Sequence, residues 1–284
     1  MKPATAAVLT HPPAAVRGRG FELTALAALF MLTLRQHLRG RRLLVLSLLF
    51  ALPAVLAAIV RLSTAYPPPA ETMEFPLVFL LIPQVLATLT ALLYAAGVIQ
   101  DEVEEQTLTY LLLRPLSRWA LYITRLLATW LVTAGLTAVF TTLTLTVVYW
   151  NTAEFWVEVL PMRALKIAAL LALAQVAYCA LFGLVSLVTR RTLIAGIVYI
   201  IAFEGLLANF ETVARRLTAM YYFRVLSLRW LDLPHAEPWA IDLATAPSAR
   251  ASTLTLLGAS LVFVLLGALL MMRREFRVKT PEGN

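Results

Sequence analysis

The stretch QDEVEEQTLTYLLLRPLSR, residues 100–118, is the most strongly charged segment between the first and the last apolar runs of the chain. Long apolar runs flank it on both sides, at residues 77–99 and 126–149. A charged side chain costs several kcal/mol inside hydrocarbon, so a segment of this kind cannot lie within a bilayer. We therefore expect residues 100–118 to form a hinge at one face of a membrane, where they meet a soluble component.

The composition of the whole chain predicts an all-α membrane protein. Its 284 residues are 61% hydrophobic and 14% charged, with a mean hydropathy of +0.81, whereas soluble domains are about 45–50% apolar and about 25% charged. A helix needs about 20 apolar residues to cross the bilayer. Six runs of that kind predict six transmembrane helices, at about residues 43–60, 77–99, 124–149, 167–189, 192–210 and 252–272.

The distribution of basic residues predicts the orientation of these spans. With the N-terminus inside, 16 Lys and Arg residues fall on the inner side and 8 on the outer side. Cytoplasmic loops carry the excess of basic residues, so we expect both termini in the cytoplasm. The basic residues beside the spans therefore explain the net charge of +8 without a nucleic-acid partner. The weak point is segment 211–250, whose five arginines lie outside in this arrangement.

Two segments outside the spans carry further pattern. From residue 21 to 38, one helical face holds Leu26, Leu29, Phe30, Thr33 and His37. This predicts either a helix in the membrane interface or a cytoplasmic extension of the first span, and both remain open. In segment 211–250, aromatic residues alternate with arginines, as at a membrane–water interface. We expect one or two short helices dipping into the outer leaflet there, with an ordinary external loop as the alternative. The terminal segments 1–20 and 279–284 are expected to be cytoplasmic tails, the first of them disordered.

Several spans contain polar residues that are candidates for a translocation path. Threonines recur on one face of the third span, and Gln175 lies in a stripe of small residues on the fourth. Such stripes allow helices to pack closely, and packing is the alternative interpretation. Glu204 is a carboxylate inside the fifth span, where charged residues are often functional, unless its side chain reaches the interface. The candidate path residues are Thr133, Thr137, Thr141, Gln175 and Glu204.

The sequence argues against an enzyme. A phosphate-binding Walker loop needs a Gly-Lys pair, and none of the eleven glycines precedes a lysine. The three histidines lie outside the predicted spans, and the single cysteine, Cys179, cannot form an intrachain disulfide. We therefore expect no catalytic residues, no metal site and no cofactor bound by this chain.

The hinge resembles the cytoplasmic signature of ABC-2 permeases, the membrane subunits of a class of ATP-binding-cassette transporters. In that signature, acidic residues precede Gly-Thr-Leu, an apolar stretch, and then Pro, a small apolar residue, Ser and Arg. The matching residues here are Glu102, Glu105, Thr107, Leu108, Leu111, Pro115, Leu116, Ser117 and Arg118, with Gln106 in place of the glycine. The resemblance extends over about residues 21–278, as an N-terminal interfacial helix, six spans, and an external helical excursion between spans five and six.

The resemblance implies that the hinge is a coupling helix seated in a groove of a separate ATPase subunit. Acids at the start of such a helix would suit its positive N-terminal dipole or basic residues of the partner, and Pro115 would end the helix. The coupling residues implied are Asp101, Glu102, Glu104, Glu105, Thr107, Leu108, Arg114, Pro115, Ser117 and Arg118.

The resemblance also implies the setting in which the chain works. ATP and Mg would be used by the partner subunit, and the permease would pair with a second copy or a paralogue in the plasma (inner) membrane. Export is the usual direction in this family. The alternative from a different class is a membrane anchor or scaffold for another enzyme, for which the hinge would have no task.

Overall fold

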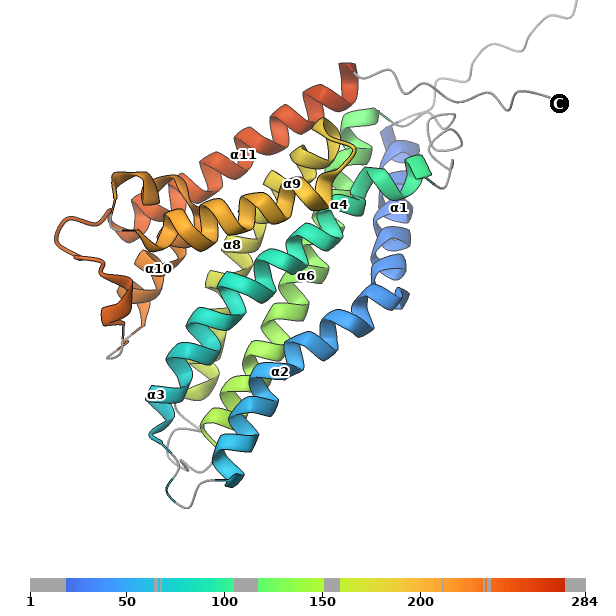
Figure 1. The fold of residues 1–284 in the computed structure, drawn as a ribbon. Helices are drawn as coiled ribbons and strands as arrows, with labels where there is room; N and C mark the ends of the chain where they lie inside the picture. The colour runs from blue at the N-terminus through green and yellow to red at the C-terminus, as the bar shows by residue number, and fades with distance from the viewer. Residues whose placement is uncertain are drawn as a thin grey trace, which may run out of the picture.

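The computed structural model of the chain is a bundle of helices (Figure 1). It describes residues 19–63, 66, 68–104, 117–150, 159–210, 212–231, 233 and 236–273, and no strand occurs among them. Within these ranges, six helices are long and apolar enough to cross a membrane. They occur in the predicted order and positions, so the all-α fold with six membrane-spanning helices is confirmed.

The spans are mostly longer than the apolar runs that predicted them. In order they are α2 (Arg41–Ser63); the continuous helix α3 (Ala70–Glu74), η1 (Phe75–Ala87) and α4 (Thr88–Glu104); α6 (Arg118–Val148); α8 (Leu160–Val188); α9 (Thr192–Tyr199) with η2 (Ile200–Leu206) and η3 (Leu207–Asn209); and α11 (Ala249–Arg273). A helix satisfies its own backbone hydrogen bonds, and it therefore continues past the last apolar residue into the charged flanks.

The helices α6 and α8 form the centre of the bundle. α8 packs against α4, α6 and α11, and α6 also contacts α2. The second and fourth spans are the most buried, whereas the first, fifth and sixth expose most of their apolar surface. Exposed apolar surface of this extent requires lipid or another protein around it, as expected for a multi-pass membrane protein.

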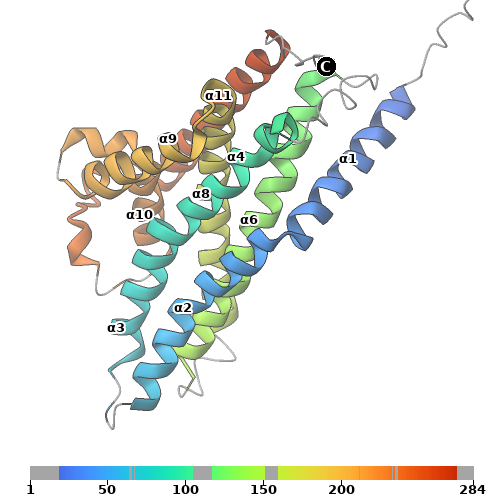
Figure 2. The ribbon, with the colours of Figure 1, turned by 45° about the vertical axis from the view of Figure 1, so that its right-hand side comes forward.

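The bundle has two ends, and the second-to-third connection defines one of them. At this hinge end, α4 finishes at Glu104 and α6 begins at Arg118 (upper part of Figure 1). At the opposite, distal end, α2 finishes at Ser63 and α8 begins at Leu160. The start of α1 (Arg19–Arg39) and the end of α11 both lie toward the hinge end (Figures 1 and 2), as an even number of spans requires.

Helix α1 is separate from the first span and runs beside α6. The chain bends at Gly40 before α2 begins. The face predicted from spacing is the inward face, since Leu29 and Thr33 are buried and His37 Nε2 lies 3.1 Å from Thr129 Oγ1 of α6. The expected helix is thus present, with this face turned toward the bundle, and the bend favours a separate helix over an unbroken extension of the first span. Its interfacial position stays a prediction, and residues 1–18 and 274–284 lie outside the described chain.

The segment between the fifth and sixth spans folds back onto the bundle. It contains α10 (Ala219–Trp230) and two short turns, η4 (Val213–Leu217) and η5 (Glu237–Trp239). α10 packs against α8 and α11, and Lys166 Nζ donates to the Trp230 carbonyl at 3.5 Å. The helix expected in segment 211–250 is present, and its packing makes it part of the bundle rather than an appended loop.

A glycine contact between α9 and α4 provides a test of this packing. A Cβ added at Gly196 would fall within the side chain of Leu92, which is fully buried. We predict that Gly196→Ala lowers the free energy of unfolding by about 1–3 kcal/mol, because a well-packed interior resists added volume. Thermal unfolding in detergent measures it. Gly258→Ala is the matched control, since nothing lies within 4 Å of a Cβ there and alanine favours a helix. Equal melting temperatures for the two variants would contradict the packing.

Candidate functional site

Half of the predicted coupling residues fall outside the described chain, within residues 105–116. These are Glu105, Thr107, Leu108, Arg114 and Pro115. Asp101, Glu102 and Glu104 belong to the last turn of α4, Ser117 directly precedes α6, and Arg118 begins it. Both flanking spans therefore reach the hinge as helices, and the coupling role of these ten residues stays a prediction.

The first three acids of the hinge continue the helix of the second span. Asp101, Glu102 and Glu104 are helical, and the described part of α4 stops at Glu104. The apolar run ends at Ile99, and the helix continues beyond it because backbone hydrogen bonding does not depend on side-chain polarity. The expectation that the acids lie at the start of a coupling helix involves residues outside the described chain and stays a prediction.

The three candidate threonines are fully buried within the bundle. Thr133 Oγ1 donates to the Trp130 carbonyl and Thr137 Oγ1 donates to the Thr133 carbonyl, each at 3.0 Å. Thr133 Oγ1 also lies 3.6 Å from Cys179 Sγ on α8. Hydroxyls bonded to their own helix allow close packing between helices. Thr141 Oγ1 is buried and has no hydrogen-bond partner among the described residues. A role of these threonines in translocation stays a prediction.

Gln175 connects the fourth span to the second. Its Nε2 donates to the Ala87 carbonyl at 3.1 Å, and the whole residue is buried. A side-chain hydrogen bond between helices in apolar surroundings fixes their register. Gln175 therefore holds α8 at the junction of η1 and α4, and its role in a path is likewise a prediction.

The buried carboxylate of Glu204 holds the beginning of α10. It accepts hydrogen bonds from Tyr199 Oη at 2.9 Å, Ala219 N at 3.2 Å and Met220 N at 3.1 Å. The first N–H groups of a helix lack intrahelical partners and favour an anion. Glu204 is therefore a cap for α10 supplied by the fifth span. Its side chain is directed to this helix and is fully buried.

Arg224, in the second turn of α10, attaches this helix to two spans. Its guanidinium donates to three oxygens, Ala208 O at 3.1 Å, Asn209 Oδ1 at 2.7 Å and Gln84 Oε1 at 3.3 Å. It also lies over the ring of Trp239, 5.7 Å from the centroid. Burial lowers the pKa of Arg224 from its ordinary value, but an arginine remains protonated in proteins. Sequence reasoning assigned Arg224 to an interfacial segment and missed this anchor.

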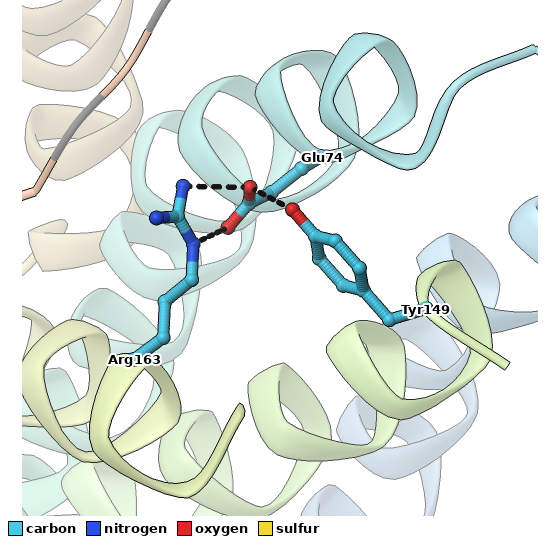
Figure 3. Close-up of polar contacts among 3 residues, drawn as sticks. All are labelled: Glu74, Tyr149 and Arg163. Atoms are coloured by element: carbon cyan, nitrogen blue, oxygen red, sulfur yellow. Dashed lines mark hydrogen bonds and ion pairs between the residues drawn. The ribbon is translucent and has the colours of Figure 1, made fainter. Parts of the chain in front are cut away.

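A second charged cluster, which the sequence did not indicate, lies at the distal end of the bundle (Figure 3). Arg163 donates to both oxygens of Glu74, from Nε at 2.7 Å and from Nη2 at 2.8 Å. Tyr149 Oη donates to the same carboxylate at 2.7 Å. We call the Glu74–Arg163 pair, together with the Tyr149 hydroxyl bound to it, the distal ion pair. It joins the second and fourth spans to the end of the third. Glu74 and Arg163 each precede their predicted apolar run, so the pattern of spans gave no signal for it.

A fold of six membrane-spanning helices around buried polar contacts defines the chain as a multi-pass membrane protein. Residues 27–276 match the sequence model described as ABC-2 family transporter protein. The match covers most of the chain, which therefore belongs to the ABC-2 family of transporter proteins. No curated protein matches the chain. The expected family is confirmed, and membership makes the chain the membrane component of a transporter. The family implies pairing with an ATP-binding subunit. Within the described ranges, no group of three or more His, Cys, Asp or Glu residues is arranged to hold a metal ion.

The distal ion pair is expected to be sensitive to the loss of one partner. We predict that Arg163→Met lowers the free energy of unfolding by about 3–5 kcal/mol, because it leaves a buried carboxylate uncompensated. Tyr149→Phe is expected to cost less, about 1.5–3 kcal/mol, since one hydrogen bond to a charged group is lost. Thermal unfolding in detergent measures both. The double variant Glu74→Gln/Arg163→Met is the control and is expected to be more stable than Arg163→Met alone. The reverse order would contradict the pairing.

If Glu204 holds the start of α10, its removal should make buried positions of this helix more accessible to solvent. A reporter cysteine at Ser227, which is fully buried in α10, should react slowly with a maleimide in the otherwise unchanged protein. We expect Glu204→Ala to raise its reaction rate at least several-fold, because the two hydrogen bonds that hold the start of α10 are lost. Glu237→Ala removes an exposed acid of the same segment and serves as the control. An unchanged rate for Glu204→Ala would show that the cap does not hold the helix.

Proposed function

We propose that the chain is the permease subunit of an ABC exporter that works as a dimer with two ATPase subunits. The observation that supports this most is the hinge. Two long spans, α4 and α6, flank residues 101–118, a segment whose sequence contains four acids and two arginines. The starting and finishing helices of the chain reach the same end (Figure 1). The proposal places this end in the cytoplasm, in accord with its excess of basic residues, and the protein in the plasma (inner) membrane.

In this proposal the chemistry of ATP belongs to the partner. ATP and Mg bind to the ATPase subunits, and their closure displaces the hinge of each permease. The hinge acids pair with basic residues of the partner's groove. Displacement of α4 and α6 then changes the packing between the two permeases and opens a path to the outside.

The proposal predicts an effect of charge reversal at the hinge. We expect Glu102→Lys/Glu105→Lys to leave membrane insertion intact and to remove most of the ATPase subunit that copurifies with the tagged chain. The reason is that two attractive charges become repulsive. Copurification from gently solubilised membranes, followed by the ATPase activity of the complex, measures it. Glu237→Lys, an exposed site between the fifth and sixth spans, is the control for charge alone.

The same experiment distinguishes the transporter subunit from the alternative function, a membrane anchor or scaffold. A membrane anchor or scaffold has no ATPase seated on the hinge. For such a protein, a stoichiometric partner with a phosphate-binding loop would be missing from the wild-type preparation, and the charge reversal would have no effect on any bound protein. Either result would argue for the scaffold and against the transporter subunit.

A further inference from the structure

The first two turns of α6 contain two buried residues that reach other spans. Tyr122 and Arg125 follow Arg118, where the hinge joins the helix, by four and seven positions. Tyr122 is fully buried and Arg125 is 5% exposed. Both lie closer to the hinge than the buried charges Glu74, Glu204 and Arg224 described above. They are the first buried polar side chains that a displaced hinge would move on this helix.

Arg125 connects the two helices that leave the hinge. Its Nη1 donates to the Val98 carbonyl of α4 at 2.9 Å. A carbonyl has two lone pairs, so this oxygen can accept the guanidinium as well as the N–H of its own helix. An arginine taken out of water is costly unless it is hydrogen-bonded, and the bond is therefore difficult to release. It fastens α4 to α6 within a few residues of both ends of the hinge.

Tyr122, about one turn before Arg125 on α6, fits into a notch formed by two glycines. A Cβ at Gly267 of α11 would lie 2.5 Å from the Tyr122 hydroxyl oxygen and 2.7 Å from Cζ. A Cβ at Gly183 of α8 would lie 3.0 Å from the same hydroxyl oxygen. Only glycine leaves room for the ring at Gly267, and the three helices are in close contact at this level. The contact leaves little free space, so a shift of α6 must displace α8 and α11 as well.

We propose that Arg125 and Tyr122 are positioning residues that carry the movement of the hinge into the bundle. Arg125 makes α4 and α6 move as one unit, and Tyr122 passes that movement to α8 and α11. This inference rests on the proposed function, because it requires a hinge that an ATPase subunit displaces. Closely packed elements shift between discrete arrangements rather than deform, and a buried hydrogen bond with a glycine notch provides such a connection.

The test follows the distal end of the bundle while nucleotide acts at the hinge end. Cysteines for spin labels are introduced at Leu62 and Val213, which are 87% and 81% exposed, and the native Cys179 is buried. The full chain is assembled with its ATPase subunit in lipid nanodiscs. The distance distribution between the labels is recorded without nucleotide and with ATP, Mg and vanadate, and ATP hydrolysis is measured on the same samples.

The inference predicts a split between hydrolysis and movement. Arg125→Gln and Tyr122→Ala are expected to reduce the nucleotide-dependent distance change by at least half while hydrolysis stays within about twofold of wild type. Arg125→Lys keeps a cationic donor, and Tyr122→Phe keeps the ring but loses a hydroxyl that has no hydrogen-bond partner among the described residues. Both are expected to behave as wild type. Should Tyr122→Ala fail to fold, the comparison of Arg125→Gln with Arg125→Lys tests the inference by itself.

A structural control separates transmission from general weakening. Leu145→Ala removes a fully buried side chain from the distal part of α6 and should destabilise the protein while keeping the distance change. If Leu145→Ala also loses the change, or if Arg125→Gln and Tyr122→Ala both keep it, the inference is overturned and the proposed function stands. If the wild-type chain binds no ATPase or shows no distance change, the proposed function fails and the inference fails with it.

Discussion

The structure depends on one constraint, that a charge within an apolar bundle must have a partner. Glu74 has Arg163, Glu204 has the first N–H groups of α10, and Arg125 has a carbonyl of α4. Each partner belongs to a different helix from the charge. The cost of burying a charge thus becomes a specific connection between helices, because the charge is tolerated only in the arrangement that supplies its partner. Apolar contacts in a bilayer do not provide this, since lipid tails satisfy leucine and valine equally well.

These connections are distributed along the length of the bundle. Arg125 lies at the hinge end, Glu204 and Arg224 fasten α10 to the fifth and second spans, and Glu74 lies at the distal end. The centre of α6 is connected as well, since Trp130 Nε1 donates to the Ala172 carbonyl of α8 at 2.9 Å. A bundle joined at several levels along its length responds as a unit when one end is displaced. That distribution suits a protein that passes movement from one end to the other.

The spans were predictable because the thickness of the bilayer fixes the length of an apolar run. The shared face of α1 was predictable because helical periodicity alone determines which residues lie together, as Leu29, Thr33 and His37 do. The distal ion pair was not, because the pairing of Glu74 with Arg163 joins residues far apart in sequence. The contacts of Arg224 were missed for the same reason, because its partners are set by the packing of α10.

The connection between the hinge and the bundle bears on the choice between the two functions. The helices α4 and α6 flank the hinge, and Arg125 of α6 joins them through the Val98 carbonyl at 2.9 Å. A buried arginine is tolerated only where its hydrogen bonds are supplied, so the two helices keep this arrangement. A membrane anchor gains nothing from a rigid connection between a charged segment and its spans. A permease that an ATP-binding subunit moves depends on such a connection, which therefore argues for the transporter subunit.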